Sequence, residues 1–441
     1  MLTKGEVLPE NPHGRCIAGR ITRRNVLVGA GVAALMTAAP RAYAAGISGE
    51  VVLLNWNGGN DFDAIKELQA AFVAANPGVK FTNVTVTGTG DQRGAIRTAL
   101  LGGQTADLLI NAWPAFRAEL ATGGMLRDLG PMWDQHKLSE NLSDGWKTQG
   151  STGGVLYGIT HTYGDRSALY YNKATFAKAG ITPPVNWTEF LASFAALKKV
   201  GVTPIGLGAK VWSHGEFFET LLLRTAGTDF AAKLAKHDAK WTSKEVTATL
   251  VKWRELIDAG AFGDISVALA SDDGMMTDNV LKNGTYGSHL IGPWTNSYAK
   301  SIGLKEGVDY SIYQFPAMGV GHDDTSSIDT NEYVGLSSGA NPAAADAFLA
   351  WLTTAAAANL IAKSGKASPS NKVDAALYGP VLAVAVENVA KSKLQFVLGD
   401  LLPGDLVDEY RVQLQKFLLD PSDAGIAKVT ADIEAKAATA Y

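Results

Sequence analysis

The α/β pattern of the chain begins at Val51-Val52-Leu53-Leu54, which is followed by Asn55-Trp56-Asn57-Gly58-Gly59-Asn60. The apolar residues predict a short buried strand, and the Asn- and Gly-rich segment after them predicts a turn. Residues 61–75 have the apolar spacing of an amphipathic helix, which Asn76-Pro77-Gly78 ends. The alternation continues with a strand over residues 79–86, a helix over residues 93–101 and a buried strand over residues 107–112. This order favours parallel strands joined by crossover helices, so the predicted class is α/β.

The rest of the chain follows the same mixed pattern. Helices are predicted over residues 187–199, 216–225, 243–259, 343–362 and 405–419, and strands over residues 202–208 and 288–291. Thr188 is the expected N-cap of the helix that begins at residue 187. There is no internal repeat and no low-complexity linker between these segments.

The N-terminus has the features of an export signal. Thr22-Arg23-Arg24-Asn25-Val26-Leu27 places two arginines before an uncharged apolar run over residues 26–39, and Ala42-Tyr43-Ala44 supplies a small-x-small cleavage site. The run is shorter than the roughly 20 residues that span a bilayer, so cleavage after Ala44 is expected rather than anchoring. Residues 1–44 are therefore predicted to be a signal peptide of the twin-arginine type, with an ordinary secretory signal as the alternative.

The composition of residues 45–441 excludes several classes of protein. The single cysteine, Cys16, lies in the predicted leader, so disulfides, cysteine catalysis and a lipid-modified N-terminal cysteine are excluded. Without the leader the chain has 33 basic and 41 acidic residues, a net charge of −8, and no basic tract. Nucleic acid and anionic membrane surfaces are therefore unexpected partners. A length of 397 residues predicts two domains, and the absence of a linker predicts that the chain crosses between them more than once.

Several sequence blocks together carry a family resemblance. The most specific block runs from Tyr170-Tyr171-Asn172-Lys173 through Phe176, Ala179-Gly180-Ile181, Pro184 and Trp187 to Phe190. A second block is Gly201-Val202-Thr203-Pro204-Ile205-Gly206-Leu207-Gly208, followed by Trp212 and Phe217-Phe218-Glu219-Thr220. Further matches are Asn76-Pro77-Gly78-Val79-Lys80, Gly292-Pro293-Trp294 and Phe315-Pro316-Ala317. The pattern covers essentially all of residues 45–441 and resembles the family 1 extracellular solute-binding proteins, which capture sugars for ABC importers.

The resemblance implies two α/β lobes that close on a ligand about a hinge of crossing strands. The crossings are expected at residues 159–165, 332–339 and 371–380. The N-terminal lobe is expected to comprise residues 45–160 and 338–372, and the C-terminal lobe residues 161–337 and 373–441. It also implies a small-molecule carbohydrate ligand, ABC permease subunits in the membrane as partners, a monomer, and neither cofactor nor metal. Because an unanchored binding protein needs an outer barrier, the expected location is the periplasm.

The candidate binding residues lie in predicted loops and at strand ends, where open α/β sheets bind ligands. Aromatic rings suit the C–H face of a hexose, and polar groups suit its hydroxyl rim. The aromatic candidates are Trp56, Trp113, Tyr163, Trp212 and Trp294, and the polar candidates are Asn57, Asn60, Asp61, Asn111, Asp165, His214, Glu332 and Lys366. Each has a structural alternative, because a tryptophan often packs in the core and Asp61 could simply cap its helix. Trp133, Trp253 and Trp351 fall in helical apolar patterns and are assigned to the core.

Two positions differ from the pattern of glucose-binding relatives. These relatives commonly have an acidic residue after the first Gly-Gly and a histidine between the hinge and the Tyr-Asn-Lys block, where this chain has Asn60 and Gly164. The resemblance therefore does not identify glucose as the ligand of this chain. A polyol, a glycoside or a peptide remains an alternative to a sugar. Arg166 is the only arginine candidate on the cleft segments, whereas an acidic ligand would favour a cluster of arginines.

Enzyme functions fit the sequence less well. Gly335-Leu336-Ser337-Ser338-Gly339 matches G-x-S-x-G, but the hydrolase order requires a later histidine and the last histidine is His322. A secreted glycosidase would need two carboxylates across a cleft, for which Asp165 and Glu332 are the conceivable pair. His214 has no HExxH motif or histidine cluster around it. Binding without catalysis is the favoured interpretation.

Overall fold

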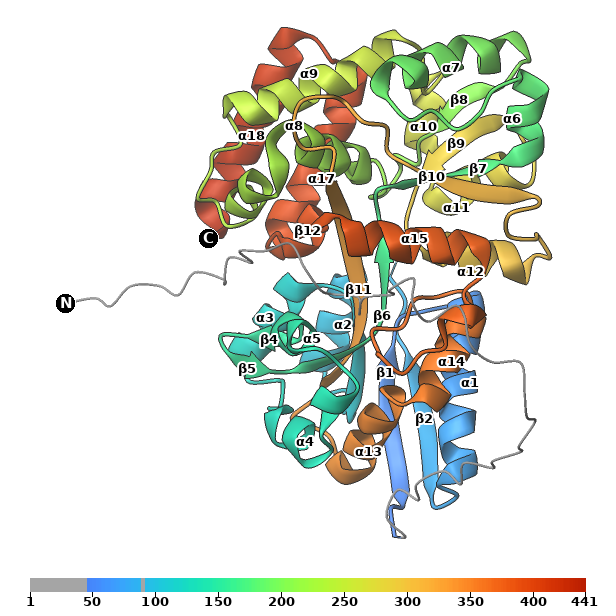
Figure 1. The fold of residues 1–441 in the computed structure, drawn as a ribbon. Helices are drawn as coiled ribbons and strands as arrows, with labels where there is room; N and C mark the ends of the chain where they lie inside the picture. Colours follow the sequence, from blue (N-terminus) through green and yellow to red (C-terminus); the bar gives the residue numbers. More distant parts are fainter. Residues whose placement is uncertain (1–45, 89–91) are drawn as a thin grey trace.

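Two separate β-sheets, each covered by helices, organise the computed structural model, which describes residues 46–88 and 92–441 (Figure 1). We call the lobe built on β1–β5, α1–α5, α13 and α14 the N-lobe, and the lobe built on β7–β10, α6–α12, α17 and α18 the C-lobe. The predicted signal peptide, residues 1–44, lies outside the described residues.

The N-lobe sheet begins with the strand predicted at residues 51–54. This strand, β1 (Gly49–Asn55), pairs in parallel with β2 (Val79–Thr85) and β3 (Leu108–Asn111), and helices α1 (Gly59–Ala75) and α2 (Gln92–Leu101) make the crossovers. Val51 and Leu53 are fully buried beneath α1 and α13, whereas Leu54 faces a second apolar cluster on the other side of the sheet. The α/β class predicted from the sequence is confirmed.

The C-lobe contains a four-stranded mixed sheet in the order β10-β7-β9-β8. Its strands are β7 (Ala168–Asn172), β8 (Thr203–Gly206), β9 (Tyr286–Leu290) and β10 (Tyr310–Gln314). Its largest apolar core packs against four long helices, α8 (Gly215–Ala235), α9 (Lys244–Asp258), α17 (Gly404–Leu419) and α18 (Asp423–Ala440). Trp253 is fully buried in this core, and Trp133 and Trp351 are buried in the N-lobe core, as predicted.

Shorter elements complete both lobes. In the N-lobe they are α3 (Pro114–Thr122), α4 (Gly130–Gln135), α5 (Asp144–Gln149), β4 (Ser151–Thr152) and β5 (Val155–Leu156). In the C-lobe they are α6 (Lys173–Ala179), α7 (Trp187–Lys199), α10 (Ile265–Ala270), α11 (Asp273–Leu281) and α12 (Trp294–Ser301). Between the lobes lie α15 (Pro380–Lys391) and β12 (Lys393–Phe396) (Figure 1). The short helix α16 (Leu398–Leu401) contacts α3 of the N-lobe and α8 of the C-lobe.

Two long strands connect the lobes. β6 (Gly158–Asp165) runs antiparallel to β11 (Thr325–Gly335), with Val334 opposite Gly158 and Ile328 opposite Asp165 (Figure 1). β11 begins seven residues before the crossing expected at residue 332, because its first residues pair with β12. The chain passes through residues 371–380 without a strand and reaches α15, which lies across the junction. A register shift between Asn331 and Glu332 marks the middle of the β6–β11 pair.

Two local expectations are corrected by side-chain hydrogen bonds. The N-cap of α7 is Asn186 rather than Thr188, because the Asn186 side chain accepts a hydrogen bond from the Glu189 N–H at 2.9 Å. The helix expected over residues 343–362 is two helices, α13 (Pro342–Leu352) and α14 (Ala355–Lys363), bent by 66°. The Thr353 and Thr354 hydroxyls donate to carbonyls of the last turn of α13, which ends that helix.

No single helix within residues 46–88 and 92–441 has both the length and the apolar composition to cross a membrane. The bent pair α13 and α14 meets that test of length and composition only when its two helices are taken together.

A buried ion pair joins β11 to the N-lobe interior. Arg117 Nη1 lies 2.6 Å from a Glu332 carboxylate oxygen, and both side chains are at most 4% exposed. Asn111 also donates to Glu332 at 2.7 Å, and Gly158 leaves room for the carboxylate, since a Cβ there would lie 2.2 Å from it. Arg117 donates further to the Gln149 carbonyl at 2.6 Å. The pair therefore ties the crossing strand to α3, which carries Arg117, and to the end of α5, which carries Gln149.

Removal of one partner from this pair is expected to destabilise the protein strongly. Glu332→Ala leaves the Arg117 charge buried and unpaired, which costs about 3–5 kcal/mol of unfolding free energy. Glu387→Ala is the matched control, because its ion pair with Lys391 is more than 60% exposed and contributes under about 1 kcal/mol. Urea unfolding followed by far-UV circular dichroism measures both. An equal loss in the two variants would contradict the structural role of Glu332.

Candidate ligand-binding site

A cavity of about 350 Å³ lies between residues of the two lobes, within the range of small-molecule sites. Its walls come from strand ends and helix starts of the N-lobe, the connecting strands, and the C-lobe. The lining residues are Trp56, Asn57, Gly58, Asp61, Gln92, Ala112, Trp113, Thr162, Tyr163, Arg166, Trp212, Asp273, Pro293, Trp294, Asp329, Asn331, Lys366, Asp400 and Arg411.

Four tryptophans line the cavity as two contacting pairs, one from each lobe. In the N-lobe the Trp56 and Trp113 ring centroids are 4.9 Å apart with planes at 37°, and the Trp56 indole N–H donates to the Ile110 carbonyl at 2.8 Å. In the C-lobe the Trp212 and Trp294 rings meet edge to face at 5.6 Å. Trp56 follows β1 and Trp113 follows β3, so adjacent parallel strands deliver the first pair to one edge of the sheet. Each lobe thus offers an aromatic surface to a bound molecule.

The position of Trp294 depends on a glycine in the connecting strand. A Cβ at Gly164 would lie 2.1 Å from the Pro293 Cγ atom, far inside van der Waals contact. A Cβ at Gly292 would similarly lie 2.0 Å from the Trp294 ring. The two glycines let the loop before α12 pack directly on β6. The absence of a histidine at residue 164 therefore has a steric reason in this chain.

The N-lobe supplies an ion pair at the edge of the cavity. Asp61, in the first turn of α1, lies 2.6 Å from the Lys366 ammonium, and both side chains are partly exposed. Asn57 is held beside them by its N–H, which donates to the Asn55 side chain at 3.0 Å. An amide, a carboxylate and an ammonium group together offer donors and acceptors to hydroxyl groups.

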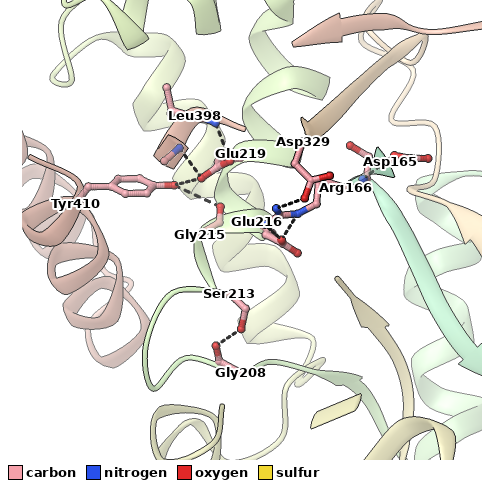
Figure 2. Close-up of polar contacts among 12 residues, drawn as sticks. Asp165, Arg166, Gly208, Ser213, Gly215, Glu216, Glu219, Asp329, Leu398 and Tyr410 are labelled. Carbon is pink, nitrogen blue, oxygen red and sulfur yellow. Dashed lines mark hydrogen bonds and ion pairs between the residues drawn. The ribbon is translucent and has the colours of Figure 1, made fainter. Parts of the chain in front are cut away.

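The C-lobe side is dominated by Arg166, which directly follows β6. Its Nε–H donates to Glu216 at 2.5 Å and its Nη1 to Asp329 at 3.0 Å, so that α8 and β11 hold it from two directions (Figure 2). Its guanidinium carbon lies 4.7 Å from the Trp294 ring centroid and 5.3 Å from that of Trp212. These distances place the cation in contact with both aromatic faces.

Burial disfavours ionisation of the carboxylates behind Arg166. Desolvation raises the pKa of Glu216 to about 8 despite the opposing effect of Arg166. Desolvation, with the charge of Asp400, raises the pKa of Glu219 to about 7, and desolvation raises the pKa of Asp400 to about 6. Glu219 accepts from the Tyr410 hydroxyl at 3.2 Å and from the Leu398 N–H at 2.9 Å (Figure 2). The C-lobe wall therefore carries several carboxyl groups near their protonation midpoints at neutral pH.

Comparison with known proteins identifies the family. Residues 55–359 match the model of the bacterial extracellular solute-binding proteins. The chain belongs to this family. This solute-binding protein is 25% identical over 396 residues to an uncharacterized ABC transporter extracellular-binding protein of Pyrococcus horikoshii, covering 87% of this chain and 84% of the relative. It is 25% identical over 251 residues to the multiple sugar-binding protein of Streptococcus mutans, covering 52% of this chain and 57% of the relative.

Solved structures of similar fold agree with the two-lobed architecture. The solute receptor AcbH, described as having an exclusive preference for β-D-galactopyranose, superposes with a TM-score of 0.78 at 21% identity, covering 88% of this chain and 98% of that chain. A chitin oligosaccharide binding protein superposes with a TM-score of 0.77 at 20% identity, covering 89% of this chain and 99% of that chain. The fold is that of two-lobed solute-binding proteins, as the sequence predicted.

Eight of the predicted site residues of this solute-binding protein line the cavity and five do not. The eight are Trp56, Asn57, Asp61, Trp113, Tyr163, Trp212, Trp294 and Lys366. Asn111 and Glu332 instead bind each other in the N-lobe interior, and Asp165 accepts hydrogen bonds from Ser167, Ser326 and Gln314. His214 is fully buried against the Arg411 carbonyl, and Asn60 lies in the first turn of α1, outside the lining set.

Most of the lining residues that the sequence did not select fall into three groups, on β11, on helices and on or next to β6. Asp329 and Asn331 are two residues apart in β11 and face the cavity, whereas Glu332, the residue chosen, points into the N-lobe. The alternation of side chains along a strand was the sequence signal that could have identified Asp329 and Asn331 as residues of one face. Gln92, Asp273, Asp400 and Arg411 stand on helices, whose rotation depends on tertiary packing. Thr162 and Arg166 flank the selected residues of β6.

The G-x-S-x-G match lies outside the cavity and makes a structural contact. Ser337 of the G-x-S-x-G match is exposed at the turn after β11, and its hydroxyl donates to the Gly124 carbonyl at 3.1 Å. Within residues 46–88 and 92–441, no group of three or more histidine, cysteine or acidic side chains is placed to hold a metal ion.

The free energy of unfolding is expected to fall as pH rises from about 7 to about 8.5. Glu216 and Glu219 retain protons in the folded state that the unfolded chain releases, so deprotonation favours unfolding, by up to about 1.4 kcal/mol per pH unit for each group. Burial lowers the pKa of His161 to about 3 and of His214 to about 4, so both are neutral in the folded state. Unfolded histidines, with a pKa near 6.5, lose their remaining protons as the pH rises above 7, so their opposing contribution becomes small in this window. Urea unfolding across the pH series measures the slope.

Glu216→Gln removes one of these titrations and is expected to flatten the slope. Glu387→Gln, an exposed substitution on α15, is expected to leave it unchanged. A slope that is the same in Glu216→Gln and the unsubstituted protein would contradict the assignment of the titration to Glu216.

Proposed function

We propose that this protein captures a sugar or related carbohydrate in the periplasm and delivers it to an ABC importer. The observation that carries the proposal is the pair of tryptophan surfaces, Trp56–Trp113 and Trp212–Trp294, on opposite lobes of one cavity. Aromatic faces complement the C–H faces of a pyranose ring. The amide, carboxylate and cationic groups between them complement its hydroxyl groups.

The relatives support carbohydrate as the ligand class. A sugar-binding protein of Streptococcus mutans is among the curated relatives, and the solved structures of similar fold include receptors for galactopyranose and for chitin oligosaccharides. Their differing ligands support the class without selecting one sugar for this chain. The permease subunits of an ABC transporter are the partners that the family relatives support.

Export and the expected monomeric state remain parts of the proposal. The twin-arginine motif and the cleavage site at Ala44 support translocation of the folded protein and release into the periplasm. The division at residues 160, 337 and 372 is proposed as the boundary of two lobes that close about β6 and β11.

Binding without turnover is proposed over hydrolysis of a glycoside. The two carboxylates considered for hydrolysis, Asp165 and Glu332, are both buried and occupied by protein donors. Neither lines the cavity, so neither is placed beside a bound glycosidic bond.

A thermal-shift screen against monosaccharides, disaccharides, polyols, amino acids and short peptides tests this function. A ligand that binds only the folded state adds about 2.7 kcal/mol of stability at a hundredfold excess over its Kd. The expected result is a large shift with at least one sugar, which chromatography then recovers unchanged. Shifts confined to amino acids or peptides would overturn the carbohydrate assignment, and consumption of the sugar would overturn binding without catalysis.

Truncation of one tryptophan from each pair is expected to weaken sugar binding. Trp113→Ala and Trp294→Ala should each raise the Kd at least about tenfold in titration calorimetry, because each removes a stacking surface. Trp187→Ala is the control, since Trp187 is half-buried on α7 outside the cavity. Unchanged affinity in both cavity variants, with melting temperatures showing that they are folded, would remove these residues from the site.

A further inference from the structure

Arg166 is unusual among the buried arginines because it joins the cavity to both connecting strands. It directly follows β6, its Nη1 donates to Asp329 of β11, and its Nε donates to Glu216 at the start of α8. The whole residue is 6% exposed, yet it lines the cavity. The guanidinium is therefore fixed in position before any ligand arrives.

The contacts of Arg166 leave part of its donor capacity for the cavity. A guanidinium carries five N–H groups in a planar fork. The Nε–H and one Nη2–H are directed at Glu216, and one Nη1–H is directed at Asp329. Within residues 46–88 and 92–441 these contacts use three of the five N–H groups, which leaves one N–H on each terminal nitrogen of a residue that lines the cavity. N–H groups on the two terminal nitrogens of a guanidinium can donate to two oxygens of one ligand.

The surroundings of Arg166 select among possible acceptors. The guanidinium is 4.7 Å from the Trp294 ring centroid, so a ligand that reaches its donors also contacts an aromatic wall. Four carboxyl groups line the cavity, those of Asp61, Asp273, Asp329 and Asp400, against three cations, Arg166, Lys366 and Arg411. An anionic ligand would be buried beside these acidic groups, whereas a hydroxyl oxygen adds no charge.

We propose that Arg166 is a specificity-determining residue that donates its two remaining N–H groups to hydroxyl oxygens of a neutral sugar held against Trp212 and Trp294, and that acidic sugars are rejected there. This inference rests on the proposed function, since it assumes that the cavity takes a sugar. It goes further by naming the contact that recognises the ligand and the charge of ligand that it accepts. Glu216 and Asp329 act as positioning residues for that contact.

The first experiment compares neutral and acidic sugars on the unsubstituted protein. Glucose, galactose and their disaccharides are titrated by calorimetry alongside glucuronate and galacturonate at equal ionic strength. The expected result is that the neutral sugar with the highest affinity binds at least about tenfold more tightly than its uronate. Equal or tighter binding of the uronate would overturn the inference.

The second experiment tests direct contact with a double cycle of protein and ligand changes. Deoxy analogues of the bound sugar, each lacking one hydroxyl, are titrated against the unsubstituted protein and against Arg166→Lys and Arg166→Gln. Lysine keeps the charge but lacks the planar fork. At least one deoxy change is expected to lower affinity about tenfold in the unsubstituted protein and to have almost no further effect in Arg166→Gln.

Arg117→Lys is the matched control, because Arg117 is an equally buried arginine in an ion pair outside the cavity. It is expected to retain the full effect of every deoxy change. If the Arg166 variants weaken binding equally for all analogues, Arg166 acts only through packing and the inference fails. If circular dichroism shows that either variant is unfolded, the comparison of neutral sugars with uronates alone decides whether the inference holds. If no sugar binds the unsubstituted protein, the proposed function itself fails, which is a different result from a sugar that binds without this selectivity.

Discussion

The antiparallel pairing of β6 with β11 is the contact on which both lobes and the cavity depend. These strands run through both halves of the molecule, so each contributes side chains to the N-lobe interior, the junction and the C-lobe (Figure 1). Because side chains alternate along a strand, neighbouring residues reach different surroundings. Asn331 faces the cavity while Glu332 enters the N-lobe, and the register shift between them falls at this change of surroundings. A change in strand register would therefore alter the core and the site together.

The two lobes use buried arginine–carboxylate pairs in different ways. Arg117 and Glu332 are surrounded by further protein donors and acceptors, so the pair is complete and holds the connecting strand to the N-lobe. Arg166 has two carboxylate partners but lies on a cavity wall, where aromatic rings rather than hydrogen-bonding groups cover its faces. A buried charge with donors left over is costly unless something accepts from them. The first arrangement suits a structural joint, and the second suits a surface that is completed by a bound molecule.

The sequence was sufficient for the fold and for the aromatic part of the candidate site, but less so for its charged part. Strand order and helix alternation follow from local apolar patterns, and the five aromatic candidates were selected from loops and strand ends, all of which reach the cavity. The polar candidates Asp165 and Glu332 were chosen as strand-end carboxylates, yet their side chains found protein donors. Which carboxylate faces a cavity depends on register and on partners remote in sequence. Asp400 illustrates why the sequence could not predict every charged residue of the site. It reaches the cavity because α16 packs against α8 and α3.

The shape of the C-lobe wall of the cavity depends partly on a glycine, Gly164, which leaves room for the neighbouring loop. Gly164 stands where the family resemblance leads one to expect a histidine in glucose binders, and its bare backbone allows Pro293 to pack against β6. Arg166 lies two residues after Gly164. The packing of Pro293 on β6 places Trp294 beside it, with 4.7 Å between the guanidinium carbon and the centroid of the Trp294 ring. A histidine at this position would add a polar ring and displace the loop, so both the aromatic surface and the direction of the arginine donors would change. In the proposed function, ligand preference therefore depends on the connecting strand as well as on the residues that line the cavity.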